Sequence, residues 1–222
     1  MSTAATAPRP CSVVVFASGR GSNFAALVAA QQRGELPITL RALLSDKRTA
    51  PALLLAETAG IDAVSLAPRD FADRAAFDHA IFARAASYAP DLIVLAGYMR
   101  MIDAAVIAPW IGKVINIHPS LLPKYPGLHT HARALEARDT LHGASVHFVT
   151  AELDGGPVIA QAQLRVQPGD TPETLAARLL PLEHRLLTAT VDLIARGRVV
   201  LGNDGVELDG RVLRAPLIPI PS

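Results

Sequence analysis

Short runs rich in apolar residues alternate with longer amphipathic segments over the first half of this chain. The apolar runs are typical of strands buried on both faces, and they cover residues 12–17, 36–44, 63–66, 91–96 and 113–117. The segments between them have helical spacing and cover residues 24–32, 50–59 and 73–88. Repeated strand–helix units predict an α/β fold with a doubly wound, mostly parallel sheet of the Rossmann-like kind.

The pattern changes in the second half of the chain. No helical segment separates residues 144–150 from residues 158–166, so these two predicted strands indicate a mixed or antiparallel C-terminal part. Residues 171–196 have helical spacing, and Pro181 inside them is expected to kink or break the helix. Two short apolar segments flank Asp-Gly within residues 206–213, which predicts a hairpin.

Composition excludes several classes of function. The net charge of +1 argues against a nucleic-acid partner, and no apolar run reaches the ~18–20 residues that span a membrane. The single cysteine, Cys11, excludes an internal disulfide and fits a reducing compartment. We expect a cytoplasmic protein with small-molecule substrates, made of a disordered leader over residues 1–11 and a single domain over residues 12–222.

Residues 18–23, Ser-Gly-Arg-Gly-Ser-Asn, join the first predicted strand to the first predicted helix. Glycines let the backbone turn tightly and approach a ligand, and a helix N-terminus offers free N–H groups. The motif lacks the third glycine of the dinucleotide fingerprint and the Gly-Lys-Ser/Thr ending of a P-loop. It indicates either a phosphate site or a tight turn with a serine cap.

An amide and an imidazole stand where another predicted strand meets a proline-punctuated loop. Asn116 and His118 are two residues apart, so on a strand they face the same side, at the edge where open α/β sheets bind ligands. Asp154, in the turn 153–156, could orient and charge the histidine. Singly, the three suggest a loop-tying amide, a core histidine and a turn residue. Together they indicate acyl-type transfer with an oxyanion donor and a proton carrier.

Further histidines raise the question of a metal site: His129, His131, His142 and His147. Their spacing fits no zinc-ligand pattern, and no cysteines support them. His131 is more simply explained as part of the opening of a helix that continues over residues 132–135. We therefore expect that the protein binds no metal.

Several segments together resemble a known family. They lie at residues 13–26, 95–100, 115–123, 124–131, 142–149 and 152–159. They resemble the phosphoribosylglycinamide formyltransferase family, one of the folate-dependent formyltransferases, and the resemblance runs over about residues 12–200. Asn-x-His-Pro-Ser at 116–120 is shared with the wider group. Lys-Tyr-Pro-Gly-Leu-His-Thr-His and Glu-Leu-Asp-Gly-Gly-Pro resemble this family in particular.

The resemblance implies a reaction of de novo purine biosynthesis. A formyl group would move from N10 of 10-formyltetrahydrofolate, a co-substrate, to the amine of glycinamide ribonucleotide, giving formylglycinamide ribonucleotide and tetrahydrofolate. By resemblance, Asn116 and His118 would stabilise the tetrahedral oxyanion and help carry a proton to N10. Asp154, paired with His118, would raise the pKa of the imidazole and favour its protonated form.

The resemblance also implies ribonucleotide-binding residues. Gly21, Ser22 and Asn23 would hold the phosphate, and Glu183 would hold the ribose or the glycinamide end. Residues 180–182, Leu-Pro-Leu, depart from the family pattern because they are more apolar than expected there.

The folate pocket implied by the resemblance would use side chains from two regions and backbone groups of the 150–154 loop. The side chains are those of Arg74, Met99, Arg100, Met101, Ile102 and Asn116. Residues 12–110 would then form a nucleotide- and phosphate-binding half, residues 111–200 a catalytic and folate-binding half, and residues 201–222 a hairpin tail.

Three alternatives remain open on the sequence. Methionyl-tRNA formyltransferase would need an extra basic C-terminal domain, and a formyltetrahydrofolate hydrolase would need an N-terminal regulatory domain; we expect neither. A non-catalytic nucleotide-binding module would explain residues 19–23 but would leave Asn116, His118 and Asp154 without a purpose. The oligomeric state is expected to be monomer or homodimer.

Overall fold

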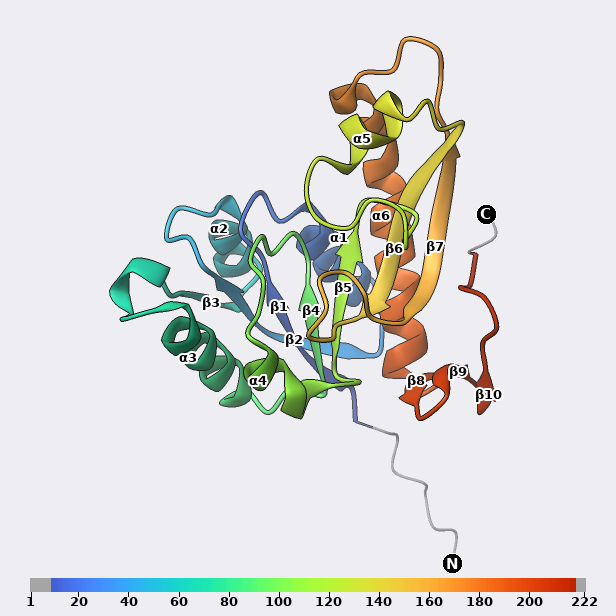
Figure 1. The fold of residues 1–222 in the computed structure, drawn as a ribbon. Helices are drawn as coiled ribbons and strands as arrows, with labels where there is room; N and C mark the ends of the chain where they lie inside the picture. The colour runs from blue at the N-terminus through green and yellow to red at the C-terminus, as the bar shows by residue number, and fades with distance from the viewer. Residues whose placement is uncertain (1–8, 219–222) are drawn as a thin grey trace, which may run out of the picture.

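The computed structural model describes residues 9–218, and its centre is a seven-stranded sheet in the order β3-β2-β1-β4-β5-β6-β7 (Figure 1). The strands are β1 (Cys11–Phe16), β2 (Ile38–Ser45), β3 (Asp62–Ser65), β4 (Leu92–Leu95), β5 (Val114–His118), β6 (Leu141–Phe148) and β7 (Val158–Arg165). The first five are parallel, whereas β6 is antiparallel to both β5 and β7. The predicted doubly wound, mostly parallel sheet with an antiparallel C-terminal part is confirmed.

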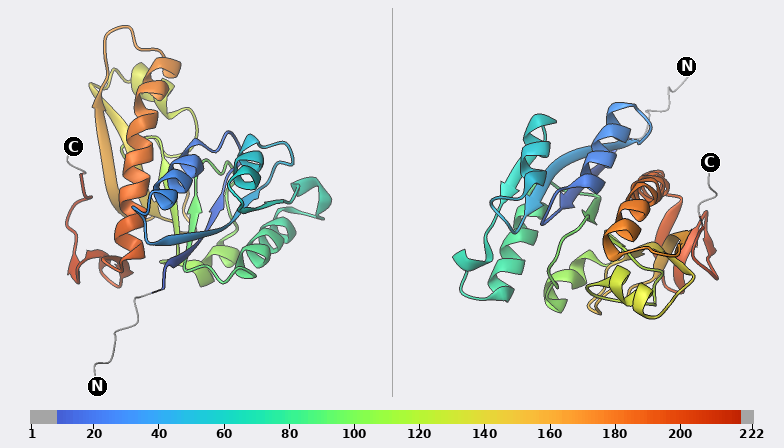
Figure 2. Two further views of the ribbon diagram at one scale, coloured as in Figure 1. Left: turned by 180° about the vertical axis from the view of Figure 1, so that it is seen from behind. Right: turned by 90° about the horizontal axis from the view of Figure 1, so that it is seen from above.

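Helices cover both faces of this sheet (Figure 2). They are α1 (Ser22–Gln32), α2 (Pro51–Thr58), α3 (Arg74–Ala86), α4 (Ala104–Ile107), α5 (Thr130–Glu136) and α6 (Pro172–Ala195). Apolar side chains of α1, α2 and α6 pack on one face, and those of α3 and α4 pack on the other. The central strands are buried on both sides, which explains their nearly continuous apolar sequence.

The sheet has a switch point between β1 and β4. The chain leaves β1 toward β2 and β3 on one side of the sheet and returns to β4 on the other side. The connections that follow β1 and β4 therefore run in opposite directions. Ser18, just after β1, ties the two ends together: its N–H donates to Gly97 O at 3.0 Å, and its hydroxyl accepts from Met99 N–H at 3.0 Å. Open α/β sheets bind their ligands at such edges.

The C-terminal part differs in two ways from the sequence expectation. The predicted break at Pro181 is wrong, because α6 is one 24-residue helix through it. Pro181 is exposed, and buried leucines on either side, Leu179 and Leu186, hold both halves of the helix on the sheet. The predicted tail hairpin is present as β9 (Gly205–Leu208) and β10 (Arg211–Val212), but it pairs with a third strand, β8 (Val199–Gly202), which the pattern did not predict.

The ends of the chain bear on the predicted leader and tail. Residues 1–8 of the expected leader lie outside the described residues, and Cys11 already belongs to β1. Leu217 forms a parallel bridge with Ala160, so the end of the described chain runs along the outer edge of β7. Within residues 9–218, no helix is long and apolar enough to cross a bilayer.

Gly21 precedes α1 in the left-handed conformation, with φ at 77°. A Cβ there would lie 2.7 Å from the Cβ of Ala52, so both the backbone and the packing of α2 require glycine. The glycine therefore has a structural reason to be present, whatever the loop binds.

Gly21→Ala is expected to lower the free energy of unfolding by about 2–4 kcal/mol, the sum of a left-handed backbone cost and an overpacking cost. Gly34→Ala is the matched control, because Gly34 has a similar φ of 72° but open space around it. The control should lose only about 1–2 kcal/mol. Urea denaturation of both variants measures the difference in the free energy of unfolding. Equal losses of stability in the two variants would show that α2 shifts at Ala52 without an energetic cost.

Candidate active site

A pocket of about 530 Å³ opens at the carboxyl ends of β4 and β5. Its lining residues come from four segments, within residues 95–102, 116–119, 127–131 and 147–154. The first two segments follow parallel strands of the sheet, the third leads into α5, and the fourth follows β6. Because β6 is antiparallel to β5, it ends beside Ile115 near the start of β5, and the loop after it folds back so that Asp154 reaches Asn116 and His118.

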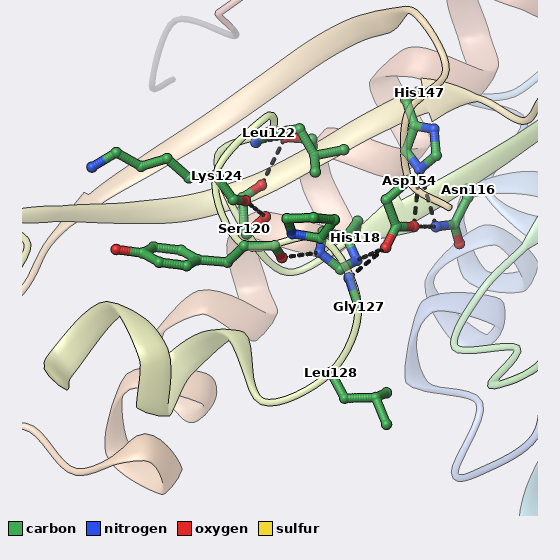
Figure 3. Close-up of polar contacts among 12 residues, drawn as sticks. Asn116, His118, Ser120, Leu122, Lys124, Gly127, Leu128, His147 and Asp154 are labelled. Carbon is green, nitrogen blue, oxygen red and sulfur yellow. Dashed lines mark hydrogen bonds and ion pairs between the residues drawn. The ribbon is translucent and has the colours of Figure 1, made fainter. Parts of the chain in front are cut away.

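The carboxylate of Asp154 lies at the centre of the polar groups in this pocket (Figure 3). Its Oδ1 accepts from Asn116 Nδ2 at 3.4 Å, and its Oδ2 lies 3.5 Å from His118 Nδ1. The N–H of Gly127 also donates to Oδ2, at 2.8 Å. The structure therefore brings together Asn116, His118 and Asp154, which are separated by up to 38 residues in the chain.

Asp154 keeps a low pKa although it is half-buried. Burial acts to raise the pKa of the carboxyl, but polar contacts with His147 and the Gly127 N–H outweigh it, and the pKa lies below its usual range. Asp154 itself has a left-handed φ of 49°. Gly156 lies so close to the carbonyl of Phe148 that no Cβ would fit. This turn therefore fixes an ionised carboxylate against the end of β5.

His118 is 6% exposed and is held from both sides. Its Nε2 donates to the carbonyl of Tyr125 at 2.9 Å, which leaves Nδ1, the nitrogen facing Asp154, with the lone pair in the neutral ring. As expected, Asp154 acts to raise the pKa of this imidazole, but the net shift of the pKa is downward, so the neutral form is favoured instead of the expected protonated form. Burial lowers the pKa of His118, and the Tyr125 carbonyl and Asp154 only partly offset it.

His147 is a site residue that the sequence analysis considered only as a metal ligand. It lies directly opposite Asn116 in the antiparallel pair of β6 and β5. Its Nδ1 donates to the Phe148 carbonyl at 2.9 Å, so its Nε2 can accept from Asn116 Nδ2, which is 3.1 Å away. Both N–H groups of the amide then point to His147 and Asp154, and the orientation of Asn116 is fixed.

The glycine loop and Glu183 form a second polar region beside the pocket. The helix α1 begins at Ser22, so Ser22 and Asn23 lie in its first turn. The N-cap residue is Gly21, and no side chain caps the helix there. Asn23 Nδ2 donates to Glu183 Oε2 at 3.0 Å, although the two residues are 160 positions apart. Burial raises the pKa of Glu183, and the bond from Asn23 partly offsets it. The amide oxygen of Asn23 is buried without a hydrogen-bond partner.

Most of the residues expected at the folate pocket lie at this pocket, but one does not. Met99, Arg100, Met101 and Ile102 all line it, as do residues 150–154. Arg74 is not among the lining residues; it is half-exposed at the start of α3, where its Nε lies 3.5 Å from Asp78. Arg74 therefore does not line the pocket at which it was expected.

The sequence profile of a family described as formyl transferase matches residues 11–191, well over half of the chain. The chain belongs to the formyl transferase family.

Two relatives of this formyl transferase match it over nearly their full length, and a third over about three quarters of its length. The phosphoribosylglycinamide formyltransferase of Escherichia coli strain K12 is 44% identical over 201 residues, which cover 90% of this chain and 95% of the relative. The solved structure of the phosphoribosylglycinamide formyltransferase of Coxiella burnetii has a TM-score of 0.90 at 43% identity and covers 94% of this chain and 99% of its own. A formyltetrahydrofolate deformylase from Pseudomonas putida KT2440 is more distant, with a TM-score of 0.80 at 27% identity, covering 91% of this chain and 72% of its own.

The other histidines that were considered as metal ligands, His129, His131 and His142, pair with each other or line the pocket. His131 Nδ1 lies 2.9 Å from His142 Nε2, and burial lowers the pKa of His142 to about 4. His129 precedes α5 with a left-handed φ of 59°. Across residues 9–218, the histidines, cysteine and carboxylates form no group of three that could hold a metal ion.

Proposed function

We propose that this protein is a phosphoribosylglycinamide formyltransferase that moves the formyl group of 10-formyltetrahydrofolate to the amine of glycinamide ribonucleotide. One observation supports this most directly: an ionised Asp154 contacts both an amide donor and a buried imidazole in a large pocket. Formyl transfer needs these three groups, since its barrier is charge on the carbonyl oxygen and movement of a proton. The strong similarity to the Escherichia coli enzyme of that name supports the same assignment.

The proposed reaction conserves protons. The substrate amine attacks the formyl carbon, and negative charge develops on the formyl oxygen. Asn116 exchanges its long 3.4 Å bond to Asp154 for a bond to this oxygen. His118 takes the proton that the amine loses and returns it to N10 as the bond between carbon and N10 breaks. Asp154 stabilises the imidazolium that exists between these two transfers.

The ribonucleotide is proposed to bind across α1 and α6. The free N–H groups of the first turn of α1, at Gly21, Ser22 and Asn23, suit a phosphate. Glu183 suits the hydroxyls of a ribose or the glycinamide end, because it is a buried acceptor held by Asn23. The folate would occupy the pocket itself, along Met99 to Ile102.

Glu183→Gln is expected to raise the KM for glycinamide ribonucleotide roughly tenfold or more, the scale of one lost charge-assisted hydrogen bond. The KM for 10-formyltetrahydrofolate should stay within about twofold, because the folate pocket is separate from Glu183. Glu136→Gln, on the exposed surface of α5, is the matched control. Steady-state kinetics with each substrate varied in turn would contradict the assignment if both KM values rose together.

The test of the function itself is turnover by the purified protein with both substrates. We expect tetrahydrofolate and formylglycinamide ribonucleotide in equal amounts, with the same rate after extensive chelation. Omitting the ribonucleotide separates the proposal from a deformylase. Formation of formate and tetrahydrofolate at the full rate without an amine acceptor would replace the transferase assignment by a hydrolase.

A further inference from the structure

A buried group of polar side chains lies beneath the loop that follows His118. Ser145 on β6 is paired with His118 on β5, and Gln161 on β7 is paired with Ser145, so the three residues form one row across the sheet. Ser145 is fully buried and Gln161 is 8% exposed. Neither contacts the pocket, because neither is among its lining residues.

The amide of Gln161 uses both of its N–H groups. It donates to the Leu122 carbonyl at 2.9 Å and to the hydroxyl of Ser145 at 2.9 Å. The same hydroxyl accepts from the Leu122 N–H at 3.0 Å and donates to the Ser120 carbonyl at 2.7 Å. Gln161 and Ser145 thus hold the backbone of the 120–122 segment at three points.

This segment connects His118 to the carbonyl that binds its ring (Figure 3). The Ser120 N–H donates to the His118 carbonyl at 2.9 Å, and the Ser120 hydroxyl donates to the Lys124 carbonyl at 2.6 Å. The next residue, Tyr125, presents its carbonyl to His118 Nε2 at 2.9 Å. The chain therefore leaves the sheet at His118 and returns to the same imidazole seven residues later.

We propose that Gln161 is a positioning residue for formyl transfer, which holds the 120–125 loop so that the Tyr125 carbonyl stays on Nε2 of His118. This inference rests on the proposed function, in which Nδ1 of His118 carries the proton. Within residues 9–218, no other side chain donates to the Leu122 carbonyl. Without the Gln161 amide, the buried Leu122 carbonyl has no side-chain donor. The loop must then move for this carbonyl to regain a hydrogen bond.

Gln161→Met tests the inference, because methionine has nearly the same length and no donor. Gln163→Met is the matched control: it is the same change on the same strand, at an exposed residue. We expect Gln161→Met to lower kcat roughly 10- to 100-fold, the scale of a misplacement of about 1 Å in the catalytic group. Both KM values should stay within about twofold, since neither substrate contacts Gln161.

The pH profile separates positioning from a merely structural role. The Tyr125 carbonyl acts to raise the pKa of His118, so its displacement should move the acid limb of the kcat profile to lower pH. The other titratable and charged side chains near His118 are the same in the variant, the control and the wild type. They are those of Asp154, His147, Arg133, His131 and His142. The nuclear magnetic resonance titration of the His118 ring in the free protein should show the same downward shift.

Three results would overturn the inference. Unchanged kcat with a lower free energy of unfolding would make the amide structural, and a lower kcat with an unmoved acid limb would exclude a route through His118. If Gln161→Met does not fold, Ser145→Ala is tested instead, because it removes the hydroxyl that bonds both Gln161 and the 120–122 backbone. The same changes in kcat and in the acid limb are expected of it. Loss of the fold in both variants would likewise make the group structural. Wild-type turnover tests the proposed function separately, so the two failures are distinguishable.

Discussion

Asp154→Asn is expected to reduce kcat by roughly 10²–10⁴-fold, the usual contribution of acid–base catalysis. The substitution keeps the shape of the side chain but removes the negative charge that stabilises the His118 imidazolium across 3.5 Å. In the wild type, Gly127 N–H donates to the Asp154 carboxylate at 2.8 Å. The substitution replaces this carboxylate by an amide. Steady-state kinetics with both substrates measures the loss, and KM should change far less than kcat.

Asp192→Asn is the matched control for this variant. Asp192 is a carboxylate paired with Arg196 on the surface of α6, away from the pocket. It should keep wild-type turnover and nearly wild-type stability, because exposed pairs contribute little. Turnover of Asp154→Asn within a few-fold of wild type, with the control normal, would remove Asp154 from the mechanism.

His118→Ala is expected to lose a similar factor of roughly 10²–10⁴ in kcat and to lose the acid limb of the pH profile. Burial holds the pKa of His118 below the ordinary value of an imidazole in the wild type. The neutral, proton-accepting form therefore predominates above that pKa, so kcat should rise with pH through it and be flat near neutrality. Rate measurements from pH 5 to 8 give the profile. His79→Ala, an exposed histidine on α3, is the control.

The double variant of His118 and Asp154 sharpens this test. Two groups that act as one unit show strongly non-additive losses, so the double variant should be about as slow as the slower single variant. Losses that multiply would mean that the two residues act independently. The 3.5 Å contact between them would then have no catalytic meaning.

The alternation of apolar and amphipathic segments was sufficient to predict the sheet, because strands buried on both faces have few other sequences available to them. The same reasoning placed Asn116 and His118 on one side of β5, and both line the pocket. The partner role of Asp154 was harder to predict, since it depends on how the turn after β6 folds back. Here the resemblance to a family supplied what spacing could not.

Three features lay beyond the pattern, each for a physical reason. His147 faces Asn116 only because of the register between β5 and β6, and register depends on turn geometry that composition does not determine. Arg74 lies outside the pocket because α3 begins at that residue and its side chain reaches Asp78 instead. The net pKa of His118 depends on burial, which outweighs the nearby carboxylate and cannot be read from the order of residues.

The packing of α1 against α6 has a consequence for synthesis of the protein. Phe24 and Leu27 of α1 share one apolar cluster with Leu186 and Leu187 of α6. A nascent chain that has emerged only as far as β7 has no α6, so this face of its first helix stays open to water. Contacts of such long sequence separation form late and slowly. The ribosome-bound chain therefore exposes this apolar face of α1 until α6, Pro172–Ala195, has been made.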